Sequence, residues 1–232
     1  MDIRFVYFDL DDTLLDHRHA ERAALSDVRT TFAEPFAGRD DATIHETYRA
    51  CSLPLWRQYA AGAIEKTDLK RGRFEQLLAE LDIHTLDAQT VSDHYLRRYA
   101  AHWRFVEGAR RAFLHVADRF PVGVLTNGFA EIQTQKLDQF PMLRDRTEAV
   151  VISEETGYMK PHPQVFGHAA DAADTPPDRI LYVGDSYYSD VQGGRAAGWQ
   201  VAWFTRNGHG GAAEEAPRLT FDTWDTLLDR LQ

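Results

Sequence analysis

The stretch that decides the fold is FVYFDLDDTLL, residues 5–15. Its first four residues are all apolar or aromatic, which is typical of a strand buried on both faces in a parallel sheet. The run ends at three carboxylates, Asp9, Asp11 and Asp12. Ligands of open α/β sheets bind at the carboxyl ends of the strands. The stretch therefore predicts both a central strand and the edge of the sheet at which a site lies.

The carboxylates of Asp9 and Asp11 are two positions apart and would share one face of a continuing strand. At about 4 Å and an effective dielectric constant near 20, two such charges repel by roughly 4 kcal/mol. A proton or a divalent cation would offset that repulsion. The alternative is that Asp9, Asp11 and Asp12 together form a solvated acidic turn without a bound cation. Asp12 itself is interpreted as a turn residue.

The composition is that of an ordinary globular protein. The 232 residues, 44% of them hydrophobic, suffice for one domain with a sizeable insertion. The 26 basic and 36 acidic side chains give a formal charge of −10, which argues against a nucleic-acid partner. The single cysteine, Cys51, excludes internal disulfides, fits a reducing compartment and is interpreted as core filler.

No membrane partner is expected either, because no apolar run approaches the length of about 20 residues that spans a bilayer. The chain enters its first strand at once, which leaves no room for a signal peptide. We therefore expect a soluble cytoplasmic protein, either a monomer or a homodimer.

Residues 16–104 have a helical pattern. Helices are expected near 20–32, 44–60, 67–81 and 90–103, with a kink or break at Pro54 and an N-cap at Thr67. This segment is much longer than the crossover between two strands of a parallel sheet. It predicts an inserted helical domain, 16–104, with the remaining core formed by 1–15 and 105–232.

After residue 106 strands and helices alternate. Strands are expected at 122–126, 149–153, 180–184 and 200–204, with a short run at 219–221. Helices are expected at 108–120, 130–140, 163–173, up to about 197, and at the end to 231. This alternation predicts an α/β fold, a Rossmann-like parallel sheet with helices on both faces. The glycine-rich segment 207–211 has no strand–helix context and is interpreted as a turn.

Chemically active side chains follow each predicted strand. After Asp9 and Asp11 they are Thr126, Asn127, Gly128, Lys160, Asp185 and Asp190. The carboxyl ends of parallel strands converge, so these residues are expected in one crevice. Carboxylates in that number suit Mg²⁺. A hydroxyl, a lysine and the backbone N–H groups of residues 127 and 128 suit phosphoryl oxygens.

Four segments, DLDDT at 9–13, TNG at 126–128, KP at 160–161 and GDSYYSD at 184–190, resemble in order and spacing the motifs of the haloacid dehalogenase-like (HAD) hydrolase superfamily. The helical insertion after the first motif is similar to that of the C1-cap subgroup. The resemblance implies that Asp9 is a nucleophile that becomes an aspartyl-phosphate. It implies that Asp11 is the general acid for the leaving alkoxide and then the base for water.

The same resemblance implies the remaining roles. Thr126 and Lys160 would hold the phosphoryl oxygens, with Lys160 also steadying Asp9. Asp185 would bind Mg²⁺ together with Asp9 and the backbone carbonyl of Asp11, and Asp190 would assist the metal directly or through water. Dehalogenase members lack a carboxylate at the position of Asp11, because halide departs without a proton. Its presence favours a phosphatase.

Two cap segments, 54–64 and 71–74, and the segment 152–157 resemble pyrimidine nucleoside 5′-monophosphatases, and N-acylneuraminate-9-phosphatases share some of these features. Trp56 and Tyr59 would offer aromatic faces to a base, and Arg71 or Arg73 a donor to a carbonyl oxygen or carboxylate. The alternative is that Trp56 and Phe74 only pack the cap helices together.

The sequence as a whole predicts a Mg²⁺-dependent phosphomonoesterase for a small-molecule phosphate ester, first among them a pyrimidine nucleoside monophosphate. The alternatives are N-acylneuraminate 9-phosphate, a sugar phosphate or phosphoglycolate. A phosphomutase lacks an obvious cap residue. A non-catalytic binding module on the same fold would be favoured by loss of Asp9 or Asp11, and both are present.

Overall fold

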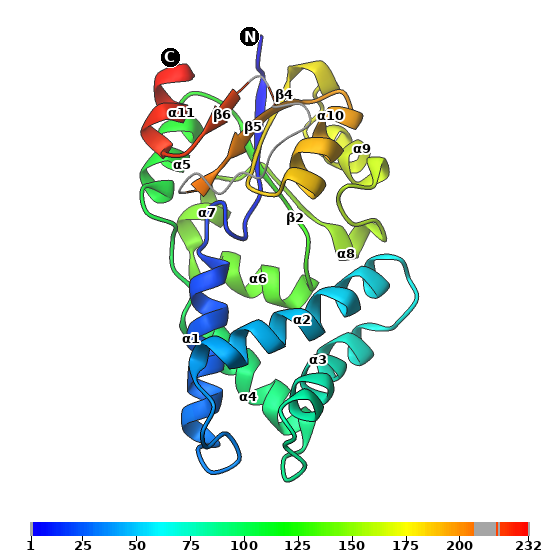
Figure 1. Cartoon of the computed structure of the whole chain (residues 1–232). Helices are drawn as coiled ribbons and strands as arrows, with labels where there is room; N and C mark the ends of the chain where they lie inside the picture. The colour runs from blue at the N-terminus through cyan, green and yellow to red at the C-terminus, as the bar shows by residue number, and fades with distance from the viewer. Residues whose placement is uncertain (1, 207–216, 218, 232) are drawn as a thin grey trace. The chain divides into compact units, whose positions relative to one another are not determined.

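The computed structural model describes residues 2–206, 217 and 219–231 of the chain (Figure 1). The chain divides into two compact units, one formed by Met1–Asp16 with Arg104–Gln232 and the other by His17–Trp103. The predicted turn at 207–211 lies outside the described residues. Among the described residues, no helix has the length and apolar character needed to cross a bilayer.

The first unit is built on a six-stranded sheet of order β3-β2-β1-β4-β5-β6, in which every pair of neighbours is parallel. In chain order the strands are β1 Phe5–Phe8, β2 Val122–Thr126, β3 Ala149–Ile152, β4 Ile180–Gly184, β5 Gln200–Phe204 and β6 Leu219–Phe221. The prediction of a Rossmann-like parallel sheet is confirmed. Strand β1 pairs with β2 on one side and β4 on the other.

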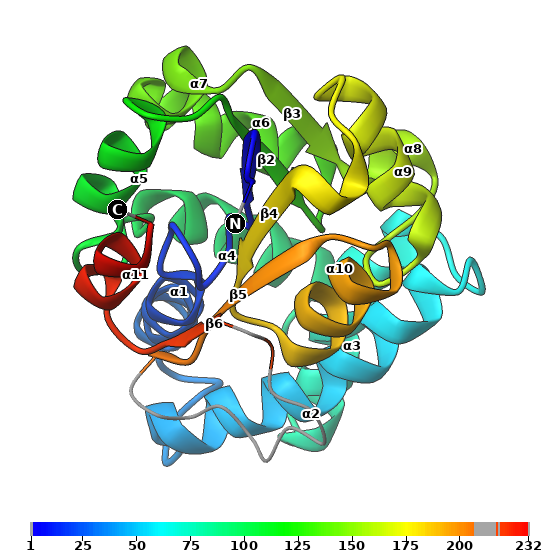
Figure 2. The ribbon, with the colours of Figure 1, turned by 90° about the horizontal axis from the view of Figure 1, so that it is seen from above.

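Strand β1 supplies both hydrophobic cores of this unit, because successive side chains of a strand point to opposite faces. Val6 and Phe8 pack with α5 (Ala109–Ala117) and α11 (Trp224–Arg230) on one face. Phe5 and Tyr7 pack with α9 (Pro163–Ala172) on the other. Figure 2 shows these helices on the two sides of the sheet. All four strand residues are buried, as an unbroken apolar run requires.

The remaining elements of the first unit follow β2, β3 and β4 in the chain. They are α6 Ala130–Gln139, α7 Pro141–Arg146, α8 Ser153–Thr156, a 3₁₀ turn at Pro177–Arg179, a π-helical turn (η2) at Tyr187–Gln192 and α10 Gly193–Ala196. The predicted strand 149–153 is one residue too long, because Ser153 begins α8. Helix α7 was not predicted. Helix α7 is separate from α6 because Pro141, which is favoured in the first turn of a helix and costly in its interior, stands at the start of α7.

The second unit consists of α1 His17–Thr31, α2 Asp41–Ala60, α3 Lys66–Glu80 and α4 Ala88–Ala101. Helix α2 continues through Pro54, so a break there is wrong. The N-cap of α3 is Glu65 rather than Thr67, because the side chains of Glu65 and Asp68 form a reciprocal capping box.

Aromatic packing holds the interior of the second unit together. The rings of Tyr48, Phe74 and Tyr95 lie within 5.1–5.5 Å of one another, centroid to centroid. Phe74 is fully buried, so the packing interpretation holds for that residue. Cys51 is buried and free, as expected of core filler.

Candidate active site

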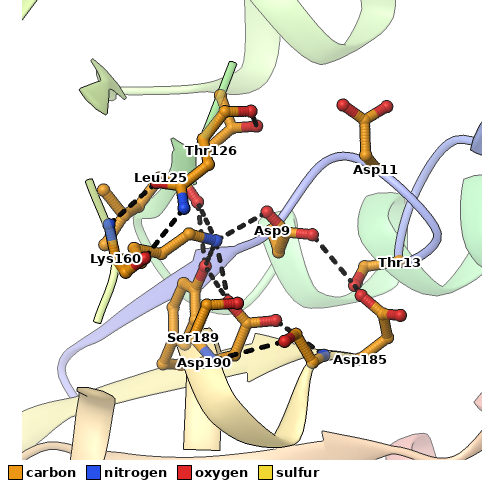
Figure 3. Close-up of polar contacts among 12 residues, drawn as sticks. Asp9, Asp11, Thr13, Leu125, Thr126, Lys160, Asp185, Ser189 and Asp190 are labelled. Carbon is orange, nitrogen blue, oxygen red and sulfur yellow. Dashed lines mark hydrogen bonds and ion pairs between the residues drawn. The ribbon is translucent and has the colours of Figure 1, made fainter. Parts of the chain in front are cut away.

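Three carboxylates gather where β1 and β4 end. Asp9 follows β1, Asp185 follows β4 and Asp190 lies on η2. Each offers an oxygen within 4.8 Å of the others. Asp9 and Asp190 are buried, and Asp185 is partly exposed. Figure 3 shows the Asp11 carboxylate turned away from this group. The pairing of β1 with β4 therefore brings together residues more than 170 positions apart in sequence.

The Lys160 ammonium lies between two of these carboxylates. Its Nζ donates to Asp9 Oδ1 at 2.7 Å and to Asp190 Oδ1 at 2.8 Å. The Tyr182 hydroxyl at 2.5 Å and the Leu125 carbonyl at 3.2 Å complete its surroundings. The Tyr182 hydroxyl itself donates to the Leu125 carbonyl at 2.8 Å. Lys160 is thus fixed by groups from β2, β4, η2 and the segment directly after β1 (Figure 3).

The side chain of Asn127 holds the backbone of Lys160. Its Nδ2 donates to the Lys160 carbonyl at 3.0 Å, and its Oδ1 accepts from the Lys160 amide at 2.9 Å. The sequence suggested only a phosphate contact through the Asn127 backbone N–H. The amide side chain has a separate structural task, which is to tie the end of β2 to the segment that carries the lysine.

Burial and neighbouring charges set the ionisation of Asp9 and Lys160. Burial raises the pKa of Asp9 to about 7, Asp190 and Asp11 act in the same direction, and Lys160 opposes them. Burial lowers the pKa of Lys160, but the attraction of Asp190 and Asp9 outweighs it and leaves that pKa above its ordinary value. The lysine is therefore charged at neutral pH, whereas burial, with Asp190 and Asp11 adding to it, keeps the Asp9 carboxyl only partly ionised there.

The carboxylate cluster fits a hard cation such as Mg²⁺. Three acidic oxygens face one another, and one ammonium contacts two of the three groups. A Cβ at Gly184 would lie 2.5 Å from Asp190 Oδ2, so glycine is needed there for Asp190 to approach the end of β4. The donor set is all oxygen, as Mg²⁺ prefers.

Thr126 ends β2 with its side chain fully buried. Its hydroxyl donates to the Asn127 carbonyl at 3.3 Å and accepts from Gln133 Nε2 at 2.7 Å. Gly128 follows with φ of 140°, and a Cβ there would lie 3.0 Å from Gln133 Nε2. The glycine thus allows the chain to turn closely around the Gln133 side chain.

Asp11 is held by two residues of α6 that the sequence interpretation missed. Lys136 Nζ donates to both Asp11 oxygens, at 2.6 and 2.8 Å. Gln133 Nε2 donates to Asp11 Oδ2 at 2.9 Å. The sequence did contain a signal for these contacts. Gln133 and Lys136 are polar residues spaced i, i+3 in the helix after the TNG segment, so they share one helix face. Thr13, also missed, donates weakly to Asp9 Oδ2 at 3.4 Å and Asp185 Oδ1 at 3.5 Å.

The four candidate substrate contacts suggested by the sequence, Trp56, Tyr59, Arg71 and Arg73, lie in the second unit. Arg73 is buried and its Nη1 donates to the Tyr48 hydroxyl at 2.9 Å. Its guanidinium carbon lies 5.7–5.8 Å from three ring centroids. Among the described residues its Nε and Nη2 have no hydrogen-bond partner. Trp56 packs edge-on against Tyr59 at 6.0 Å, and Arg71 pairs with Glu75 in solvent.

Comparison with known proteins agrees with this geometry. The description "haloacid dehalogenase-like hydrolase" fits residues 3–198. The chain belongs to this family of hydrolases. The resemblance seen in the motifs is thereby confirmed.

Curated relatives of this HAD-like hydrolase include enzymes that act on nucleotides. Pyrimidine 5′-nucleotidase YjjG of Escherichia coli is 31% identical over 95% of this chain and 92% of its own length. Pyrimidine 5′-nucleotidase PynA of Streptococcus pneumoniae is 27% identical over 98% and 94%. A crystal structure of the putative HAD-hydrolase YfnB from Bacillus subtilis, bound to magnesium, matches with a TM-score of 0.84 over 99% of both chains at 24% identity.

Proposed function

We propose that this HAD-like hydrolase is a Mg²⁺-dependent phosphomonoesterase that works through an aspartyl-phosphate on Asp9. The observation that carries the proposal is the pairing of Asp9 with Lys160 at 2.7 Å inside a three-carboxylate cluster, with Asp11 held separately by other donors. One carboxylate is thus prepared to act as nucleophile while another remains available for proton transfer.

In the first half-reaction an Asp9 oxygen forms a bond to phosphorus as the ester P–O bond breaks. The electron pair leaves with the alkoxide, which takes a proton from Asp11. In the second half-reaction Asp11 removes a proton from water, whose oxygen attacks phosphorus and releases Asp9 and inorganic phosphate. Lys160 orients Asp9 throughout, and Thr126 with the backbone N–H groups of Asn127 and Gly128 receives the phosphoryl oxygens.

Asp9, Asp185 and the backbone carbonyl of Asp11 would hold Mg²⁺. When bound there, Mg²⁺ neutralises charge on Asp9 and on the phosphoryl oxygens. Asp190 already accepts from Lys160 Nζ at 2.8 Å and from the Ser186 amide at 2.9 Å, which supports a role through water rather than direct ligation. The carboxylate at position 11 supports ester hydrolysis over dehalogenation, because an alkoxide needs a proton and a halide does not.

For the substrate we propose a pyrimidine nucleoside monophosphate, with the helical unit as the cap that selects it. The two nucleotidase relatives support this class. Two donors of Arg73, Nε and Nη2, have no partner among the described residues and also support this class, because they suit a carbonyl oxygen of a pyrimidine base. The aromatic side chain of Trp56 suits the face of such a base. A second candidate is another small phosphate ester, because a glyceraldehyde 3-phosphate phosphatase of Pyrococcus furiosus is 29% identical over 87% of this chain and 80% of its own length. Cytoplasmic location and a monomeric or dimeric state remain predictions.

The test is a panel of phosphate monoesters assayed with Mg²⁺ and with EDTA. It contains UMP, dUMP, dTMP, purine nucleotides, glyceraldehyde 3-phosphate, phosphoglycolate and N-acylneuraminate 9-phosphate. We expect EDTA-sensitive phosphate release that is fastest with the pyrimidine nucleotides and absent in Asp9→Asn. Turnover retained by Asp9→Asn would eliminate the nucleophile, and no hydrolysis of any ester would favour a non-catalytic binding module.

A further inference from the structure

Helix α6 sends two buried polar side chains to a single carboxylate. Gln133 and Lys136 are three positions apart and so share one face of the helix, and each is 1% exposed. Together they give the Asp11 carboxylate three donors, at 2.6, 2.8 and 2.9 Å. Rotation of the carboxylate would break all three contacts, so its direction is set by α6.

Gln133 also connects Asp11 to the end of β2. The same Nε2 that contacts Asp11 lies 2.7 Å from Thr126 Oγ1 and 2.8 Å from the Asn127 carbonyl. One amide nitrogen therefore fixes the proposed acid–base relative to the proposed phosphoryl-binding residue. These groups come from separate segments of the chain and have no covalent reason to keep this spacing.

This arrangement has a cost in stability. Gln133 Oε1 is buried and has no hydrogen-bond partner among the described residues. A buried acceptor without a hydrogen-bond partner destabilises the folded state, because it has lost its contact with water. A buried lysine also costs free energy unless its charge is compensated, which Asp11 does here. An apolar residue at either position would avoid the cost, so the polar pair is better explained by its effect on Asp11 than by stability.

We propose that Lys136 and Gln133 are positioning residues that set the direction of the Asp11 carboxylate, and through it the efficiency of proton transfer by Asp11. This inference rests on the proposed function. Its clearest consequence concerns the second half-reaction, in which Asp11 must take a proton from the attacking water. A misdirected carboxylate leaves Asp9 phosphorylated for longer.

The probe is 4-nitrophenyl phosphate, because nitrophenolate leaves without a proton and the first half-reaction then needs no acid. For this substrate kcat/KM reports formation of the phosphoenzyme and kcat includes its hydrolysis. In Lys136→Met and Gln133→Met we expect kcat to fall by about 10- to 100-fold, the range for loss of a residue that orients a functional group. We expect kcat/KM to stay within about threefold, so that KM falls with kcat, and a burst of nitrophenolate equal to the enzyme concentration.

Three further variants separate positioning from damage to the fold. Lys136→Arg keeps two donors toward the carboxylate and should restore kcat to within about threefold of wild type. Gln135→Met, an exposed position on the same helix, should leave both constants unchanged. In an Asp11→Asn background, adding Lys136→Met should lower kcat no further, because the two residues act as one unit.

The proposal is overturned by an equal fall of kcat and kcat/KM without a burst, by unchanged kinetics, or by an additional loss in the Asp11→Asn background. Failure of the proposed function looks different. In that case wild type releases no phosphate from any ester, or Asp9→Asn retains turnover, before any α6 variant is compared.

Discussion

Lys160→Met removes a cation that lies between two buried carboxylates, Asp9 and Asp190. In the wild-type protein Nζ is 2.7 Å from Asp9 Oδ1 and 2.8 Å from Asp190 Oδ1. At an effective dielectric constant near 20, each contact represents roughly 6 kcal/mol of attraction before desolvation is subtracted. Desolvation of the three buried groups and the incomplete ionisation of Asp9 cancel much of this sum. Breaking a buried pair typically has a net cost of about 3–5 kcal/mol.

We therefore expect Lys160→Met to lower the free energy of unfolding by about 3–5 kcal/mol at neutral pH in EDTA. Urea titration followed by circular dichroism measures this change, and the wild-type protein in the same buffer is the reference. Phosphate release should be lost as well, because Asp9 is no longer oriented.

A second variant tests whether charge is the cause. Lys160→Met with Asp190→Asn removes one of the two carboxylates left facing each other, while an asparagine oxygen can still accept from the Ser186 amide. The double variant should regain more than half of the lost stability. If it is no more stable than Lys160→Met, or if Lys160→Met unfolds at the wild-type urea concentration, repulsion between Asp9 and Asp190 is not what the lysine relieves.

Three other predictions follow from the same geometry. Burial raises the pKa of Asp9 from 3.8 to about 7, so between these pH values the folded state keeps a proton that the unfolded state releases. The free energy of unfolding in EDTA should therefore fall as pH rises from about 4 to about 7. Urea titrations of Asp9→Asn should lack this pH dependence. Gly184→Ala places a methyl group 2.5 Å from Asp190 Oδ2 and should weaken Mg²⁺ affinity about 10- to 100-fold by calorimetry, whereas unchanged affinity would show that Asp190 does not support the metal. Arg73→Met removes a hydrogen bond to Tyr48 but also a buried charge with two unpartnered nitrogens in the described chain, so the thermal midpoint should change little. KM for UMP should rise about tenfold, and an unchanged KM would leave Arg73 a packing residue.

The sequence was sufficient to predict the parallel sheet of the core and most of its strands and helices. An unbroken apolar run can only be satisfied by burial on both faces, so residues 5–8 predicted a parallel strand by themselves. The strands 122–126, 180–184 and 200–204 were predicted with the bounds that the structure shows. Residue type and position after a strand also selected Asp9, Asp185 and Lys160, because these signals are local.

Contacts across the sheet could not be predicted in the same way. The strand order places β1 between β2 and β4, and only this order brings Asp185 and Asp190 to Asp9. Likewise, the support of Lys160 by Tyr182 depends on which face of β4 meets the lysine.

Local sequence determined which residues carry charge, which strands are buried and where each strand ends, since these follow from composition and periodicity. Only the tertiary structure decided that Lys136 and Gln133 reach Asp11 and that the Asn127 side chain holds the Lys160 backbone. The physical reason is that hydrogen bonds of under 3.5 Å depend on the rotation of α6 and on the path of the chain after each strand. Those quantities are fixed by packing among segments far apart in sequence, and they are not encoded in any one segment.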